Sequence, residues 1–479
     1  MIKMILRSCA TQAPRIGSGA QSRLPNARAF GGALLLFTGL SACTMAPHYE
    51  RPAAPVAADW PVATPSSSAQ IKWRDLFLDP KLQQTIQLAL DNNRDLRAST
   101  LNVARAKAQY GIERSGLFPA LDGNASGTKS HTDAAGDSQA YTANLGLSWE
   151  IDLFGRVRSL SNAAKEDFFA TQENRNAAEI SLIAATAQAW LDLAADRDAL
   201  KLTQQTYDVR KNAFDIAEGR SRLGAIDDLD LADARTLMEQ ARGDLAAAET
   251  AVDQDKAALT LLTGVASISD DLLPDGLHDG QLAASLPVGL PSDVLLKRPD
   301  VLAAEHDLKA ANADIGAARA AFFPSISLTG QTGSASTSLG QLFNSGTGQW
   351  SYGAKLGVPI FEGGANINGL RSAKAGRDIA VANYEGAIQQ AFSDVSQALA
   401  VRARIDERLD AGRNAADAAT TAMKLSQARY DAGADSYLVL LDAQRTQYGA
   451  QGTLIQLEAL KASNLVALYR ALGDDDSLN

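Results

Sequence analysis

Residues 141–152 read Tyr-Thr-Ala-Asn-Leu-Gly-Leu-Ser-Trp-Glu-Ile-Asp, and residues 350–360 read Trp-Ser-Tyr-Gly-Ala-Lys-Leu-Gly-Val-Pro-Ile. In both segments apolar side chains alternate with polar or small ones, so one face of an extended strand is apolar. Alternation over such a length, with aromatic rings near the ends, is typical of membrane β-strands; a half-buried strand of a soluble sheet is the alternative. Weaker Gly/Ser-rich segments at about 120–130 and 325–333 are the expected hairpin partners, which predicts two hairpins and four strands per chain.

Four strands are too few to close a barrel. An open sheet edge is not tolerated in lipid, because its backbone polar groups would lack partners. Several chains must therefore share one barrel if these strands lie in a membrane. Three copies supply about twelve strands, a number within the range of known membrane barrels.

Two long stretches of the sequence are free of proline, which breaks helix interiors. No proline lies between Pro119 and Pro274, and none follows Pro359. Within these stretches apolar residues recur at spacings of three and four, the pattern of coiled-coil helices. Helices over about 157–222 and 364–431 would each be about 98 Å long, since a helix rises about 1.5 Å per residue.

The ends of these helices carry recognisable signals. Gly224 and Gly433 fit the position just past a helix C-terminus, where a positive φ is needed, so each long helix is expected to turn back on a second, antiparallel one. Candidate caps for the returning helices are Asp227, Asp228, Asp435 and Ser436. Arg298-Pro299-Asp300 is interpreted as structural, with proline at a helix start and Asp300 in the first turn.

The landmarks of the chain occur twice and in the same order. Gly-Leu-Phe-Pro-Ala at 116–120 corresponds to Ala-Phe-Phe-Pro-Ser at 321–325, and Leu-Phe-Gly at 153–155 corresponds to Ile-Phe-Glu-Gly at 360–363. The offset between the copies is about 205 to 209 residues throughout. Ordered landmarks at a near-constant offset indicate an internal duplication rather than chance similarity between two Ala-rich halves.

The N-terminal region has the parts of a bacterial lipoprotein signal peptide. Residues 1–42 contain five bases and no acids, with an apolar run at 30–40 that is too short to span a membrane. The run ends in Leu40-Ser41-Ala42-Cys43, which resembles a lipoprotein cleavage site; an ordinary cleavage site with a chance cysteine is the alternative. We therefore expect Cys43 to be lipidated, followed by a proline-rich tether.

Charge and composition exclude several classes of function. The net charge is −10, and without the leader 40 basic residues face 55 acidic ones, which argues against a nucleic-acid partner. Two cysteines, and four histidines without metal-ligand spacing, predict no metal site. We find no G-x-S-x-G elbow, H-E-x-x-H helix or P-loop, so we expect no enzyme activity and no cofactor beyond the lipid on Cys43. An outer-membrane enzyme remains an alternative only with a site that carries none of these motifs.

Five motifs resemble those of the TolC-type outer-membrane efflux proteins, specifically the lipidated, NodT-like branch that works with resistance-nodulation-division (RND) pumps. They are Cys43–Pro52, Leu296–Val301, Ala317–Pro324, Val358–Gly364 and the turn Tyr430–Asp442. The resemblance covers essentially the whole mature chain. It implies a fold that is mainly α with membrane β: long antiparallel coiled-coil helices form an α-barrel, and four β-strands per chain complete a 12-stranded trimeric β-barrel.

The resemblance also implies a function and partners. The chain would be a passive outer-membrane exit duct for small molecules or ions in a Gram-negative bacterium, anchored by its lipid and extending into the periplasm as a homotrimer. A periplasmic adaptor protein and an inner-membrane pump of the RND type would complete the system. The alternatives are an outer-membrane duct for type I polypeptide secretion and, in another class, a periplasmic coiled-coil adaptor lipoprotein, which would lack the two apolar strand pairs.

These expectations divide the chain into ten segments. They are a signal peptide at 1–42, a lipidated tether at 43–70, helices at 71–116, a hairpin at 117–153, a long helix pair at 154–264, an equatorial linker at 265–297, a helix at 298–322, a second hairpin at 323–361, a second helix pair at 362–471 and a tail at 472–479.

In the family, acidic residues and a tyrosine hold the periplasmic tip shut. The resemblance places gate candidates at Asp230, Asp233, Tyr430, Asp435 and Asp442. Asp435 stands where the family has an arginine, and Val439 where it has an aspartate, so the partners within this gate must differ. The alternative is that the aspartates only interact favourably with helix N-terminal dipoles.

Overall fold

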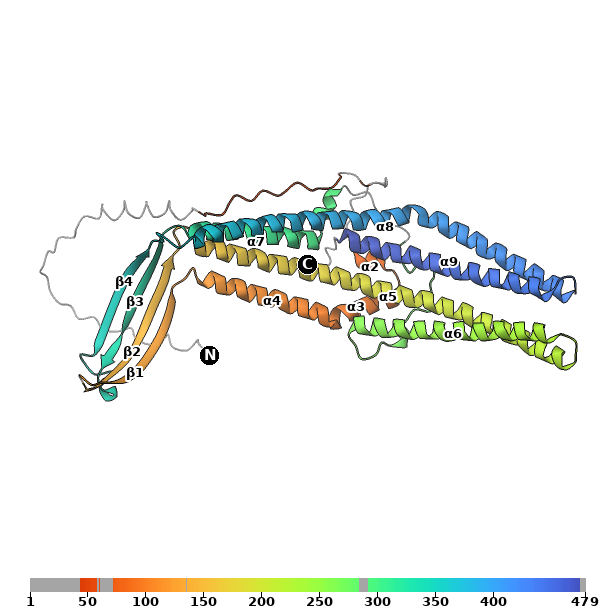
Figure 1. Ribbon diagram of the computed structural model, residues 1–479, viewed down its shortest axis with the longest axis horizontal. Helices are drawn as coiled ribbons and strands as arrows, with labels where there is room; N and C mark the ends of the chain where they lie inside the picture. The colour runs from red at the N-terminus through yellow and green to blue at the C-terminus, as the bar shows by residue number, and fades with distance from the viewer. Residues whose placement is uncertain (1–43, 58–59, 61–71, 135, 284–291, 474–479) are drawn as a thin grey trace, which may run out of the picture. The chain divides into compact units, whose positions relative to one another are not determined.

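The computed structural model describes residues 44–57, 60, 72–134, 136–283 and 292–473. The predicted signal peptide and Cys43 lie outside this part of the chain. From Thr44 onward the chain forms one unit, in which a four-stranded sheet is joined to long helices (Figure 1). Among the described residues, no helix combines the length and the apolar character needed to cross a membrane.

The four expected strands are present in one antiparallel sheet of order β1-β2-β3-β4. They are β1 Ala120–Thr132, β2 Gly136–Ile151, β3 Ser325–Ser336 and β4 Gly348–Gly357. The sheet thus consists of two hairpins joined by pairing of β2 with β3. The second alternating segment was expected to continue to 360, but β4 ends at Gly357, two residues before a proline that has no N–H for a ladder.

The register places the apolar side chains of both alternating segments on one face of the sheet. Trp149 on β2 pairs with Leu328 on β3, and Leu328 pairs with Ala354 on β4. Residues that pair directly across a ladder point to the same side, so the apolar positions of both hairpins share that side and the polar positions share the other. On the apolar face Trp350 and Tyr352 are among the most exposed large apolar side chains of the described residues, at 73% and 81%.

The helices occur in pairs of equal length, as an internal duplication requires. The pairs are α4 Arg94–Ser115 with α7 Pro299–Ala320 at 22 residues, α5 Arg156–Arg222 with α8 Ala365–Asp431 at 67 residues, and α6 Asp228–Thr263 with α9 Tyr437–Leu472 at 36 residues. Each 67-residue helix is about 100 Å long, and α6 and α9 fold back along α5 and α8.

The short helices meet the returning helices end to end. At the junction of α6 with α4, Asn93 caps α4 and donates a hydrogen bond of 2.9 Å to the Leu262 carbonyl at the end of α6. At the junction of α9 with α7, the Arg298 guanidinium donates to the Ala471 carbonyl. These two joints create composite rods, α4/α6 and α7/α9, beside the continuous helices α5 and α8.

Figure 1 shows the lateral order of the four rods, and the packing agrees with it. α5 lies between α4/α6 on one side and α7/α9 on the other, and α8 packs on the outer side of α7/α9. The main core lies where these rods meet and includes Trp190, Ile183, Tyr384 and Ile388. The four rods therefore form one row, with α8 at one end and α4/α6 at the other.

A belt of shorter elements surrounds the middle of the rods. It contains α2 Trp73–Leu76, α3 Pro80–Asn92, η1 Asp270–Leu272 and η2 Ser292–Lys297, while η3 Leu339–Gln341 lies in the β3–β4 connection. The belt is fixed to the core, since the indole of Trp190 donates to the Leu272 carbonyl at 2.9 Å.

Candidate functional site

The ends of α5 and α8 farthest from the sheet turn sharply into α6 and α9. Gly224 and Gly433 adopt φ values of 66° and 69°, which confirms the prediction of left-handed residues just past both helices. In each turn a backbone N–H reaches back to the helix: Ala225 bonds the Arg220 carbonyl and Ala434 bonds the Arg429 carbonyl, both at 2.9 Å. The tips of both repeats are therefore built from the same glycine-dependent turn.

Tyr430 lies at the point where the two tips approach each other. The Arg220 guanidinium, from the end of α5, donates a hydrogen bond of 3.2 Å to the Tyr430 hydroxyl. The Tyr430 ring lies 5.5 Å from the ring of Tyr437 on α9, and burial raises the pKa of the Tyr437 hydroxyl. The candidate gate tyrosine thus links the first repeat to the second within one chain.

Asp435 does not cap α9, so this part of the capping prediction is wrong. Its carboxylate instead binds the Arg429 guanidinium through two contacts of 2.6 and 2.7 Å, and this hydrogen bonding holds the pKa of Asp435 below its ordinary value. Ser436 takes the N-cap position of α9 without a side-chain cap hydrogen bond. In the first repeat Asp227 caps α6 as predicted, accepting from the Asp230 backbone N–H at 2.8 Å.

The other gate candidates are not brought to Tyr430 within one chain. Asp442 binds Arg445 one turn along α9 at 2.7 Å, on the exposed surface. Asp230 and Asp233 are exposed on the first turns of α6. The structure therefore assembles Tyr430 with Arg220 and Tyr437, while the acidic candidates have other partners or exposed positions.

Sequence reasoning missed Arg220, although the duplication carried a signal for it. Arg220 and Arg429 are separated by 209 residues and occupy the same place in the two repeats. The position equivalent to Asp435 is Ile226 in the first repeat. Arg220 lacks the carboxylate that holds Arg429, and its guanidinium reaches the Tyr430 hydroxyl instead.

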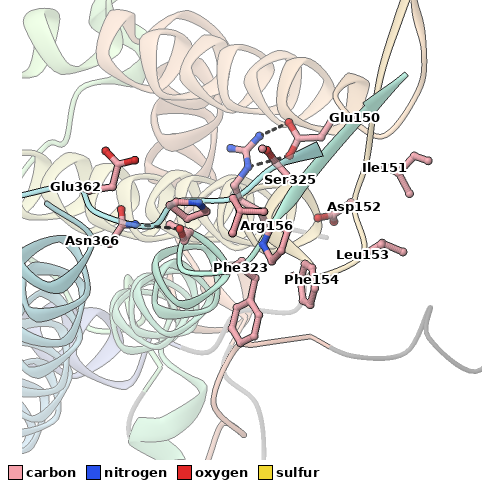
Figure 2. A pocket seen from close by; sticks show the side chains of 16 residues that line it. Glu150, Ile151, Asp152, Leu153, Phe154, Arg156, Phe323, Ser325, Glu362 and Asn366 are labelled. Carbon is pink, nitrogen blue, oxygen red and sulfur yellow. Dashed lines mark hydrogen bonds and ion pairs between the residues drawn. The ribbon is translucent and has the colours of Figure 1, made fainter. Parts of the chain in front are cut away.

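At the opposite ends of α5 and α8, a hollow lies between the sheet and the helices (Figure 2). Glu150 at the end of β2 binds Arg156 at the start of α5 through contacts of 3.1 and 2.7 Å. Asp152 accepts from the first backbone N–H groups of α5, including that of Arg158 at 2.8 Å. The rings of Phe154 and Phe323 stack at 4.7 Å. These contacts connect the sheet to the helices, so we interpret the residues around the hollow as a structural junction.

Arg298-Pro299-Asp300 has the structural role predicted for it. Pro299 is the first residue of α7 and Asp300 lies in its first turn. The Arg298 side chain is buried and also lies 3.5 Å from Asp394 on α8. In the described part of the chain, no group of three His, Cys, Asp or Glu side chains is placed to hold a metal ion.

The family model described as outer membrane efflux protein matches residues 85–265 and 290–474. The chain belongs to this family. The toluene efflux pump outer membrane protein TtgC of Pseudomonas putida is 42% identical over 450 residues, covering 91% of this chain and 93% of the relative. OprJ of Pseudomonas aeruginosa is 40% identical over 458 residues, covering 93% and 96%. The open state of the MtrE outer membrane channel of Neisseria gonorrhoeae has 42% identity and a TM-score of 0.83, covering 90% of this chain and 98% of that one.

This outer membrane efflux protein is therefore the outer-membrane channel component of a tripartite efflux system, and not an enzyme. It works with an adaptor and an inner-membrane pump. Membership of the family excludes the periplasmic adaptor lipoprotein that the sequence left open. The tip cluster around Tyr430 and the junction in Figure 2 are then the two ends of the helical part of an efflux channel.

Proposed function

We propose that three copies of this chain form a passive, lipid-anchored exit duct for small molecules, energised by an RND-type inner-membrane pump. The observation that carries the trimer is the open sheet: β1 and β4 are edge strands, and both are exposed along nearly their whole length. Lipid cannot satisfy the free backbone groups of such edges, so β1 of one copy would pair with β4 of the next. Three copies would then supply twelve strands.

The helices support the same assembly. The two ends of the helix row carry exposed apolar side chains: Leu101 and Ile112 on α4 are 60% and 62% exposed, and Ile367 and Ile379 on α8 are 51% and 62% exposed. A contact between two different surfaces, one at each end of the row, is heterologous. Such contacts generate a closed ring when the rotation from one copy to the next adds up to a full turn. In the trimer, α8 of one copy would pack on α4/α6 of the next.

We further propose that Tyr430 and the surrounding charged residues form the periplasmic gate, and that the transported compounds are small and largely apolar. The gate proposal is supported by the link from Arg220 to Tyr430, which joins the two helix hairpins of one chain at their tips. The substrate proposal is supported by relatives named as toluene and solvent efflux pump proteins.

Accumulation of a compound panel in cells with and without the gene tests the function. The panel holds dyes, antibiotics, solvents and metal ions, and the secreted proteins are analysed alongside. Small molecules should accumulate in the deletion strain and be expelled again when the intact gene is restored. Loss of a secreted polypeptide without any accumulation would refute the small-molecule assignment in favour of type I secretion.

A further inference from the structure

A hollow of about 820 Å³ lies between α5, α8 and α9, near the middle of α8 and beside the joint of α9 with α7. Each of these three helices contributes residues at spacings of three and four, so each turns one face to the hollow. Its volume lies within the range of small-molecule sites. We name it the mid-length hollow, and the lining residues that decide its chemistry are Gln188, Asp394, Asn464, Ala467 and Arg470.

The mid-length hollow opens on the side of the helix row that faces away from the belt. On α5 the indole of Trp190 binds a belt carbonyl, and Gln188 lies two residues away, about 200° around the helix. On α8 the Phe392 ring stacks at 4.8 Å on Trp60, and Asp394 is displaced from Phe392 by the same angle. Trp60 belongs to the segment that leads back to the proposed lipid anchor, and a lipid in the membrane must lie outside the duct. In the proposed trimer the hollow therefore faces the duct.

Part of the wall of the mid-length hollow is apolar. Six of the described lining residues are alanines, distributed over α5, α8 and α9, and their small side chains leave the space open. Larger aliphatic side chains lie among them, namely Ile180, Val401, Leu460 and Val466. A ligand with a hydrocarbon body would bury apolar surface against this wall, which favours binding.

The amide side chains of the hollow present acceptors to a ligand. Gln390 donates to the Asp394 carboxylate at 2.7 Å, and Gln188 donates to two neighbours at 2.7 and 2.8 Å, so their oxygens are left for a ligand. Asn464 is 4% exposed and donates to a backbone carbonyl of α8 at 2.8 Å, while none of the described residues donates to its Oδ1 atom. A buried acceptor without a donor is costly, so a ligand that carries N–H groups fits this wall.

Asp394 supplies the charge of the hollow. Its side chain is 36% exposed; Gln390 holds one carboxylate oxygen, and the other lies 3.5 Å from the Arg298 guanidinium. Arg298 makes shorter contacts of 3.0 and 2.6 Å with Asp300, so one buried guanidinium serves two carboxylates. The charge of Asp394 is therefore only partly matched. Arg470 also lines the hollow, but it is exposed, and its long side chain can keep the guanidinium in water.

We propose that the mid-length hollow binds amphiphilic organic cations on their way through the duct, with the ammonium group at Asp394 and the hydrocarbon body against the alanine-rich wall. This inference rests on the proposed small-molecule duct and names a class of substrate within it. The N–H groups of the ammonium are also donors for the Asn464 amide oxygen. Binding has to be weak enough for release, as at other sites along a conduction pathway.

Three dansyl compounds that differ in charge test this inference on the full-length protein in phosphatidylcholine nanodiscs. Dansylcadaverine carries an ammonium group, its N-acetyl derivative is neutral, and dansyl-aminocaproate carries a carboxylate. Binding is followed by dansyl emission at neutral pH, and the signal of empty nanodiscs is subtracted. Trimer assembly of every variant is checked by gel filtration.

The intact protein should bind dansylcadaverine about tenfold more tightly than the neutral derivative, because a hydrogen bond to a charged group forms only with the ammonium. Asp394→Asn should remove this preference. Asp410→Asn should keep it, since Asp410 is an exposed carboxylate about 24 Å farther along α8. Arg470→Gln should tighten the binding of dansylcadaverine, because it removes a like charge from the rim.

Ala467→Phe provides a second test that leaves every charge in place. Ala467 is exposed and lines the hollow, so a larger side chain there fills the space without displacing the core. This variant should weaken the binding of all three compounds. It tests the site even where Asp394→Asn disturbs Arg298.

An ammonium preference that is equal in Asp394→Asn and the intact protein would overturn the site. Tightest binding of the carboxylate compound would overturn the proposed class, because Arg470 would then govern the hollow. The compound panel in cells separates these failures from failure of the proposed function. Accumulation in the deletion strain without an ammonium preference would leave the duct and overturn the site, whereas an ammonium preference without any accumulation would keep the site and overturn the duct.

Discussion

Gly264, at the joint between α6 and α4, should tolerate substitution less well than the turn glycine Gly224, although both have a φ of 66°. A Cβ atom on Gly264 would lie 2.5 Å from the carbonyl oxygen of Asn92 and 2.9 Å from its carbon, whereas nothing lies within 4 Å of one on Gly224. Alanine at either position costs about 1–2 kcal/mol of left-handed backbone strain. At Gly264 the backbone clash adds about 1–3 kcal/mol, because the opposing atoms belong to a helix end and not to a flexible side chain.

Hydrogen exchange of the Gly264→Ala and Gly224→Ala proteins measures this difference locally, without assuming that the whole channel unfolds in one step. Amides at the α6–α4 joint should exchange about 5- to 150-fold faster in Gly264→Ala, beyond the acceleration that Gly224→Ala causes at its own turn. Trimer assembly in detergent serves as the control for gross misfolding. Equal local acceleration in the two variants would refute the reasoning, because strain alone would then explain both.

Three further outcomes are expected. Arg220→Ala should raise single-channel conductance in planar bilayers by freeing Tyr430. Arg222→Ala, whose side chain lies 3.7 Å from Glu218 on the same helix, should not, and equal conductance in both variants would count against the gate. Burial, with the charges of Asp196 and Asp192, raises the pKa of Asp255 to about 6, so the folded state binds this proton more tightly than the unfolded state does. Stability should therefore fall as the pH rises from about 4 to 6, and Asp255→Asn should flatten that part of a denaturation-midpoint profile; an unchanged profile would contradict the assignment. Arg298→Met should destabilise the protein by about 2–4 kcal/mol in the same denaturation assay, because it removes a buried guanidinium that pairs with Asp300 and donates to the Ala471 carbonyl. A loss below about 1 kcal/mol would show that water takes the place of the guanidinium.

Much of the fold could be predicted from the sequence, because it depends on local patterns. The alternating faces of β2 and β4, the proline-free helices and the turn glycines all follow from rules that act over a few residues. The constant offset between landmarks then predicted two copies of each element, and the equal helix lengths confirm it.

The side-chain partners at the tip could not be predicted in the same way. Asp435 has the right residue type and position for a helix cap, but an arginine six residues earlier competes for it once the turn folds. Arg220 finds its partner 210 residues away, in a different repeat. The segment after Cys43 was expected to be an extended tether without a fold of its own. Its hydrogen bonds with α7, such as those from Arg51 to Glu305, join residues more than 250 positions apart and could not be predicted from local patterns.

The end-to-end joints have a mechanical consequence for each protomer. A continuous helix such as α5 or α8 resists twisting, because an unbroken ladder of hydrogen bonds runs through it. The composite rods α4/α6 and α7/α9 resist compression equally well, but no such ladder crosses the joints at Asn93 and Arg298. Each chain thus combines two helices that resist twisting with two rods that can rotate at a joint, placed between a helix of 22 residues and one of 36. Any twisting of the chain about its long axis is therefore expected to concentrate at these two joints, while the continuous helices keep their shape.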